Sequence, residues 1–321
     1  GPPSGVPGRE RIGAKLGKTS AALLCEDAPH EHPLFHQAAT IHPEQPTRSL
    51  GGGRFPRSTL FSYDDLAEEL SPFLLLDYAG PKDFPATSGK RGVGEHPHRG
   101  FETVTIVYHG EVEHRDSGGG GGKIGPGEVQ WMTAAAGVVH EEFHSREFSA
   151  RGGRFEVIQL WVNLPRAKKM MPPGYQALTR DRIPEVELPR AEGKVRLLAG
   201  ELLGAHGPAR TQSPIQLWDV QLNAGARWEF SLPEGSTTAC FVLSGRIELD
   251  SGKSAGPAEL AVFSREGSRL EFVASKPTTL LLLNGAPLGE PVVGYGPFVM
   301  STEAEIRQAF ADYQSGKMGR L

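Results

Sequence analysis

The sequence has few cysteines, no long apolar run and little net charge. Its 321 residues include only Cys25 and Cys240, which are too few and too far apart for a disulfide framework or a cysteine-bound metal. Its apolar stretches, such as residues 280–283, are far shorter than the roughly 18 residues of a transmembrane helix. The net charge of -4 argues against a nucleic-acid-binding surface. We therefore expect a cytoplasmic protein, also nuclear in a eukaryotic cell, that binds neither membranes nor nucleic acid directly.

Helical patterns are scarce, and most of the chain has the pattern of short β-strands. Four runs are rich in β-branched and aromatic residues, namely residues 103–108, 155–162, 215–222 and 239–243. The 41 glycines and 26 prolines separate such runs, as they do in sandwiches and barrels. The sequence therefore predicts an all-β fold.

One helix is predicted at the C-terminus. Thr302 can accept a hydrogen bond at the start of the helix, and Glu305 can complete a capping box. Apolar side chains follow at helical spacing, at positions 306, 309, 310 and 313. We predict a short helix over residues 303–315 that packs on the β-structure through this stripe.

A weak internal repeat divides the β-rich region into two halves. The repeated segments are residues 107–113 with 242–248, and residues 125–132 with 256–263. In each half a strand enters a glycine turn, a second strand leaves it, and a Gly-Pro turn introduces the next strand. We therefore predict an irregular extension at residues 1–45, two similar barrels at 46–180 and 181–300, and a C-terminal helix and tail at 301–321.

Two pairs of ligand-type side chains lie in the first predicted barrel. His96 and His98 are two residues apart, as are His140 and Glu142, so on β-strands each pair points to one face. Three imidazoles and a carboxylate can bind one divalent metal ion. The sequence therefore predicts a metal site in the barrel at 46–180.

The second predicted barrel lacks these ligands. At the positions equivalent to the three histidines, the repeat carries Ser231, Pro233 and Leu270. These side chains do not suit a divalent transition metal. The metal site is therefore an addition to one barrel and not a requirement of the fold.

Six motifs carry a resemblance to a known family. They are His96-Pro-His-Arg-Gly-Phe-Glu-Thr-Val104, Gly110-Glu-Val-Glu-His-Arg-Asp-Ser117, Pro126-Gly-Glu-Val-Gln-Trp-Met-Thr-Ala134, Gly137-Val-Val-His-Glu-Glu142, Gln159-Leu-Trp-Val-Asn-Leu164 and Gly296-Pro-Phe-Val-Met300. Over roughly residues 46–316 the chain resembles the pirin family, within the cupin superfamily. The resemblance implies a bicupin fold of two tandem cupin barrels, which are double-stranded β-helices of the jelly-roll type.

The resemblance also implies one iron ion, held by His96, His98, His140 and Glu142. This ligand set suits Fe(II), and also Mn, Co, Ni, Cu or Zn, because the affinity order does not choose among them. An octahedral ion with four protein ligands keeps two positions for water, a chelating substrate or dioxygen. Glu142 is then also the candidate catalytic residue, as the acceptor of a substrate proton.

The carboxylate ligand has an alternative. Glu102 has the spacing used by other cupins, and its parity matches that of His98 if the strand is unbroken at Gly100. We favour Glu142, and keep Glu102 as an alternative ligand or as a hydrogen-bonding neighbour of the ligands.

Other histidines and the tryptophans have plainer interpretations. We place His114 and His144 at hydrogen-bonded strand ends, His109 on the surface, and His30-Glu31-His32 in an incidental surface cluster. The strand patterns predict that three tryptophans, Trp131, Trp161 and Trp218, lie in the core. As an alternative, Trp131 or Met132 lines the pocket beside the metal.

Two functions from different classes fit the resemblance. The first is a quercetin 2,3-dioxygenase-type oxidoreductase that acts on a small aromatic, flavonol-like substrate. The second is a metal-dependent, redox-sensitive regulatory protein that binds transcription factors or metabolic enzymes. We expect a monomer in either case.

Overall fold

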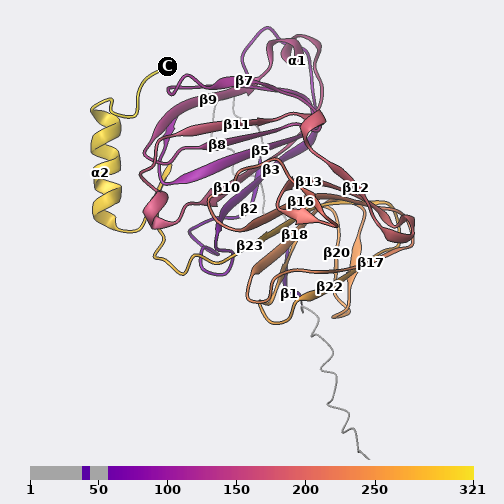
Figure 1. Cartoon of the computed structure of the whole chain (residues 1–321). Helices are drawn as coiled ribbons and strands as arrows, with labels where there is room; N and C mark the ends of the chain where they lie inside the picture. Colours follow the sequence, from indigo (N-terminus) through magenta and orange to yellow (C-terminus); the bar gives the residue numbers. More distant parts are fainter. Residues whose placement is uncertain (1–37, 44–56) are drawn as a thin grey trace, which may run out of the picture. The chain divides into compact units, whose positions relative to one another are not determined.

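The structure, a computed structural model, describes residues 38–43 and 57–321, whose regular secondary structure is mostly β-strand (Figure 1). The all-β prediction is confirmed. Among the described residues no helix is long and apolar enough to cross a membrane. Cys240 is a buried free thiol, and Cys25 lies outside the described residues.

The first half of the chain forms two sheets. The six-stranded sheet has the order β11 (Gly174–Leu178), β8 (Val129–Thr133), β5 (Phe101–His109), β10 (Gly153–Asn163), β3 (Phe73–Phe84) and β2 (Ser58–Phe61). The four-stranded sheet has the order β4 (Gly92–His98), β9 (Val138–His144), β6 (Val112–Asp116) and β7 (Gly121–Ile124).

The second half forms a similar pair of sheets. The seven-stranded sheet has the order β1 (Ala38–His42), β21 (Glu259–Phe263), β18 (Thr237–Ser244), β23 (Thr278–Gly285), β16 (Ile215–Leu222), β13 (Gly193–Ala199) and β12 (Glu185–Glu187). The four-stranded sheet has the order β17 (Ala226–Ser231), β22 (Arg269–Ala274), β19 (Ile247–Leu249) and β20 (Ser254–Ala255).

Short elements complete the fold. Two small hairpins pair β14 (Glu201–Leu202) with β15 (Ala205–His206) and β24 (Val293–Tyr295) with β25 (Phe298–Met300). The α-helices are α1 (Arg146–Arg151) and α2 (Glu303–Gln314), and 3-10 turns lie at Arg166–Lys168, Arg180–Arg182 and Pro189–Ala191.

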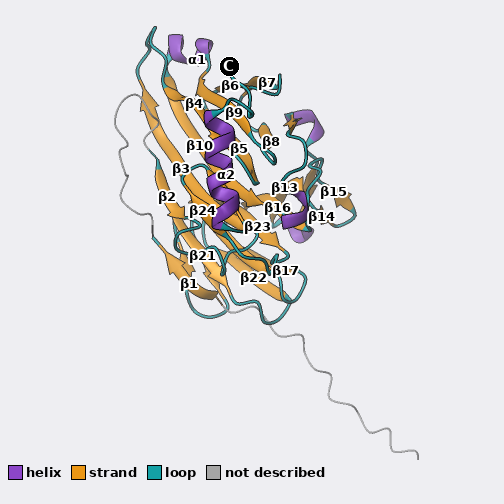
Figure 2. Ribbon diagram, turned by 90° about the vertical axis from the view of Figure 1, so that its left-hand side faces the viewer, coloured by secondary structure: helices purple, strands orange, loops and turns teal. Residues whose placement is uncertain are grey.

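The two large sheets are covered on both faces, which explains the continuous apolar runs of the sequence. In β23, Leu281 and Leu283 lie in a core shared with the six-stranded sheet of the first half, whereas Leu280 and Leu282 lie in the interior of the second half. Successive residues of a strand point to opposite faces, so both faces of β23 must be apolar. Figure 2 shows the strands of the two halves side by side.

The internal repeat corresponds to equivalent turns in the two halves. β5 and β6 are joined at Gly110, and β18 and β19 are joined at Gly245. These glycines have φ values of 86° and 87°, in the left-handed region that glycine adopts without a Cβ clash. The Gly-Pro turns at residues 125–126 and 256–257 precede β8 and β21.

Within the extension predicted to be irregular, the structure describes one strand that the sequence did not indicate. β1 pairs antiparallel with β21, so Ala38 lies opposite Phe263 and His42 opposite Leu260. Ile41 packs against the core of the second half. A five-residue strand without regular alternation is hard to separate from a loop by sequence, and its pairing partner lies more than 200 residues away. The rest of the extension up to residue 37 lies outside the described residues.

The C-terminal helix is confirmed. The Thr302 hydroxyl accepts a hydrogen bond from the Glu305 backbone N–H, and the Glu305 carboxylate accepts one from Ser301 N–H. Ile306 and Ala309 are buried in a cluster with side chains of β25. The six-residue helix α1 was not predicted, and the Ser145 hydroxyl caps its start.

Candidate metal centre

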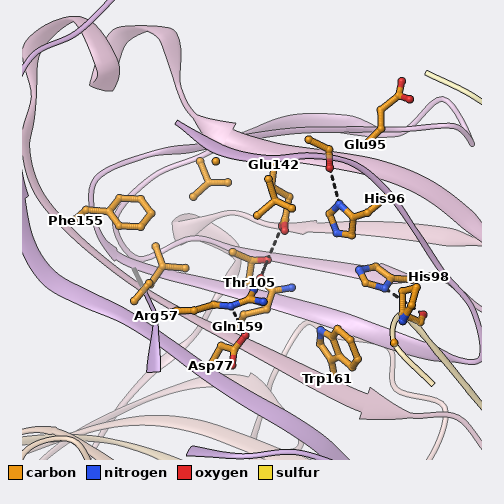
Figure 3. Close-up of a pocket in the computed structure, with 18 residues that line it drawn as sticks. Arg57, Asp77, Glu95, His96, His98, Thr105, Glu142, Phe155, Gln159 and Trp161 are labelled. Atoms are coloured by element: carbon orange, nitrogen blue, oxygen red, sulfur yellow. Dashed lines mark hydrogen bonds and ion pairs between the residues drawn. The ribbon is translucent and has the colours of Figure 1, made fainter. Parts of the chain in front are cut away.

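Two paired strands bring the predicted ligands together. β4 and β9 are antiparallel neighbours, and His96 lies directly opposite His140. His98 and Glu142 lie two residues further along their own strands and therefore point to the same face. Figure 3 shows His96, His98 and Glu142 around one cavity.

The ligand atoms of His96, His98 and His140 all lie within 4.8 Å of one another, and His140 forms a second such group with His114 and Glu142. The Nε2 atoms of His96 and His140 are 2.8 Å apart. Metal–nitrogen bonds of about 2.0–2.1 Å at right angles place two nitrogen atoms about 3 Å apart. The spacing therefore fits two neighbouring ligands of one metal ion.

Backbone carbonyl groups fix the orientation of two of the rings. His96 Nδ1 lies 2.7 Å from the Gly94 carbonyl oxygen, and His98 Nδ1 lies 3.3 Å from that of Pro297. A carbonyl oxygen only accepts, so Nδ1 carries the proton in both rings. The Nε2 lone pairs remain available to a metal, as is usual for metal-binding histidines.

The third ring is supported by another histidine. His140 Nδ1 lies 3.4 Å from His114 Nδ1, and His114 stacks at 7° on the ring of Tyr175. His114 Nε2 lies 3.4 Å from Asp116 Oδ2, within ion-pair distance but not aligned for a hydrogen bond. His114 therefore lies in the middle of β6, buried behind His140, and not at the strand end where we predicted it.

Burial keeps the imidazoles of His98 and His140 neutral. His140 is fully buried and His98 is 4% exposed. Burial, and then the neighbouring histidines, lower the pKa of both rings well below the ordinary histidine value. Neutral imidazole is the form that binds a metal ion, so the donor set fits a divalent cation.

Glu142 lies at the edge of the cavity and is 8% exposed. Its Oε1 lies 3.3 Å from the Thr105 hydroxyl, which is also 2.9 Å from Gln159 Oε1. The hydroxyl has one proton and can donate to one of these acceptors at a time. Thr105 therefore links the Glu142 carboxylate to the floor of the cavity.

Glu102 points away from the histidines. Its side chain is fully buried and its Oε1 accepts a hydrogen bond of 2.6 Å from the Thr133 hydroxyl. Burial raises its pKa to about 7, although the Thr133 hydrogen bond opposes this. The expected parity with His98 fails because Gly100, with a φ of 92°, separates β4 from β5, and these strands belong to different sheets.

The cavity has a volume of about 710 Å³, which is typical of sites for small organic ligands. It extends from the histidines along the six-stranded sheet to Arg57, Asp77, Gln159, Phe155 and Trp161 (Figure 3). Sequence reasoning did not select Arg57, Asp77, Thr105 or Gln159. Asp77, Thr105 and Gln159 are polar residues inside strand runs, which become meaningful only once the strands are paired, whereas Arg57 precedes β2 and carries no such signal.

Other predicted positions have mixed outcomes. The side chain of His109 is 51% exposed, as expected. His144 follows the parity of His140 but packs among the rings of Phe84, Phe148 and Phe155 at the strand end. The group His30-Glu31-His32 lies outside the described residues.

The predictions for the three tryptophans also have different outcomes. Trp131 and Trp218 are buried core residues, as expected. Trp161, predicted to be core, is instead partly exposed and lines the cavity. The prediction followed the apolar strand pattern, but β10 turns alternate residues toward the cavity.

Comparisons with known proteins agree with this architecture. Residues 54–162 match the family described as Pirin, and residues 217–319 match the Pirin C-terminal cupin domain. A protein of Pseudomonas aeruginosa, whose name gives it provisionally as a quercetin 2,3-dioxygenase, is 54% identical over 269 residues, covering 84% of this chain and 94% of the relative. Human pirin is 37% identical over 261 residues, covering 78% of this chain and 84% of the relative.

A solved structure extends the similarity to the fold. The crystal structure of quercetin 2,3-dioxygenase from Acinetobacter baumannii superposes with a TM-score of 0.86 at 48% sequence identity, covering 89% of this chain and 99% of that chain. The fold is therefore that of two cupin domains in tandem, and the chain belongs to the pirin family.

Proposed function

We propose that this pirin is a metal-dependent dioxygenase that acts on a flavonol-like aromatic substrate. The observation that carries the proposal is the cluster of His96, His98 and His140, with Glu142 in a second group that shares His140, beside a cavity of about 710 Å³. A metal that only stiffened the barrel would not need a cavity of this size. The quercetin 2,3-dioxygenase names of the Pseudomonas and Acinetobacter relatives support the same reaction.

We assign the metal to His96, His98, His140 and Glu142, and we propose Fe(II). Mn, Co, Ni, Cu and Zn also suit nitrogen and carboxylate ligands. When bound, iron would supply open coordination positions at which an oxygen-chelating substrate and dioxygen can meet.

The side chains of the cavity would carry out the remaining tasks. The Glu142 carboxylate is placed to accept the proton of a substrate hydroxyl, and Thr105 holds one of its oxygen atoms. Phe155 and Trp161 form apolar walls that would displace water from around a bound aromatic ring.

Oxygen uptake with quercetin tests the proposal. The iron-loaded protein should consume oxygen above a control with iron alone, and His98→Ala should abolish the excess. His109→Ala, which changes an exposed histidine, should behave as wild type. Absence of turnover by the loaded wild type would rule out the dioxygenase function for quercetin.

The regulatory function remains a second candidate because the centre contacts the C-terminal region. His98 contacts the Pro297 carbonyl, and the adjacent Arg99 forms an ion pair of 2.9 Å with Asp312 in α2. A change in metal charge could reach α2 through these contacts. Hydrogen exchange of residues 298–314 should then differ between the Fe(II) and Fe(III) forms, and identical exchange would count against this function.

A further inference from the structure

A row of polar side chains crosses the six-stranded sheet beneath the candidate metal centre. Thr59 on β2 lies opposite Asp77 on β3, Asp77 lies opposite Gln159 on β10, and Gln159 lies opposite Thr105 on β5. Directly opposed residues of antiparallel strands point to the same face. The four side chains thus form one continuous strip on the face that carries the cavity.

Contacts hold this strip in place. The Thr59 hydroxyl donates a hydrogen bond of 2.6 Å to Asp77 Oδ1, and Arg57 Nε lies 3.0 Å from Asp77 Oδ2. The Asp77 side chain is only 4% exposed, whereas the Arg57 side chain is 40% exposed. Burial raises the pKa of Asp77, and the Arg57 charge opposes that rise. Arg57 is therefore tethered to a buried carboxylate while part of it stays open to solvent.

The strip lies between apolar walls. On β10, Val157, Gln159 and Trp161 point to the same face, and all three line the cavity. Trp161 stacks on Phe101 with a centroid distance of 4.3 Å and meets the His98 ring edge-on at 5.1 Å. Figure 3 shows Arg57, Asp77, Gln159 and Thr105 clustered below Glu142, with Trp161 toward His98. This arrangement suits a flat ring whose faces are apolar and whose edge carries hydroxyl groups.

We propose that Arg57, Asp77 and Gln159 form a subsite that selects substrates with hydroxyl groups remote from the oxygen atoms that chelate the metal. This inference rests on the proposed function, because it places the chelating end of the substrate at His96, His98 and Glu142. A phenolic hydroxyl both donates and accepts, and the Gln159 amide can meet either need. The Arg57 guanidinium only donates, so it favours an oxygen with partial or full negative charge. The subsite therefore favours a polyhydroxylated flavonol over the bare flavonol skeleton.

The test compares quercetin with 3-hydroxyflavone, which keeps the chelating 3-hydroxyl and 4-carbonyl groups but lacks the other hydroxyls. Titration calorimetry of the Fe(II)-loaded protein under nitrogen gives both Kd values without turnover. We expect quercetin to bind at least about tenfold more tightly, since a site built for hydroxyl groups rejects analogues that lack them. Equal Kd values in the wild type would overturn the proposal.

Variants then locate the subsite. Arg57→Met and Gln159→Leu should weaken quercetin binding about tenfold and leave 3-hydroxyflavone within twofold. Arg154→Met, which changes an exposed arginine on the same strand β10, should alter neither Kd. Equal weakening of both ligands by Arg57→Met and Gln159→Leu, with iron content and Tm retained, would overturn the assignment to these residues.

The outcome is separable from that of the proposed reaction. Hydroxyl-dependent binding without oxygen uptake would sustain the subsite and remove the dioxygenase function. Oxygen uptake with hydroxyl-independent Kd values would overturn the subsite alone.

Discussion

Replacing His114 with phenylalanine should weaken metal binding without abolishing it. The His114 ring is buried behind His140, with 3.4 Å between their Nδ1 atoms, and it stacks on Tyr175. Phenylalanine keeps the ring and the stacking but removes the contact that orients His140. Partners of metal-binding histidines contribute about 10- to 100-fold in affinity. Because 3.4 Å is long for a hydrogen bond, we expect the lower end, about tenfold or about 1.4 kcal/mol.

The assay is a competition titration of Co(II) against a chelating dye, with His109→Phe as a matched control at an exposed histidine. His98→Ala should abolish Co(II) binding and serves as the reference for complete loss of the site. His140 also belongs to a group with His114 and Glu142, so a second outcome is informative. If His114→Phe removes binding as completely as His98→Ala does, His114 is itself a ligand. If the affinity stays within twofold of wild type, the orienting role is refuted.

Further predictions concern the two carboxylates and the buried ion pair. Glu142→Gln should lower the iron content of the protein by at least about tenfold whereas Glu102→Gln should not, as metal analysis would show. The Glu102 pKa of about 7 lies above its unfolded value of about 4.5, so the protonated side chain stabilises the fold below pH 4.5 and this stability is lost as the pH rises through 7. In urea denaturation, the free energy of unfolding of the wild type should fall by about 3 kcal/mol relative to that of Glu102→Gln as the pH is raised to 8. Asp312→Ala, which breaks the buried pair with Arg99, should cost about 3–5 kcal/mol in the same assay, against less than about 1 kcal/mol for the exposed Glu303→Ala.

Local sequence patterns predicted the elements of this fold well where the pattern is contained within one element. The helix start at Thr302 and the glycine turns at Gly110 and Gly245 are of this kind, because each depends on residues that are neighbours in the chain. Strand β1 and the walls of the cavity depend on pairing between distant strands. Where both faces of a strand are buried, the sequence pattern does not indicate on which face a residue such as Trp161 lies.

The same distinction applies to the candidate site. The spacing of His96 with His98, and of His140 with Glu142, sufficed to place each pair on one face, and the pairing of β4 with β9 brings the two pairs together. The expectation that Glu102 shares a strand face with His98 failed because it assumed a continuous strand through Gly100. At Gly100 the chain passes from one sheet to another. Asp77 and Gln159 have no motif, since their meaning arises from cross-strand register alone.

Anomalous diffraction at the iron edge, on crystals of the protein loaded anaerobically with Fe(II), tests the central claim most directly. We expect a single peak per chain, within bonding distance of the Nε2 atoms of His96, His98 and His140 and of a Glu142 oxygen. A peak bonded to Glu102 or His114 in place of these side chains, or no peak after loading, would contradict the account.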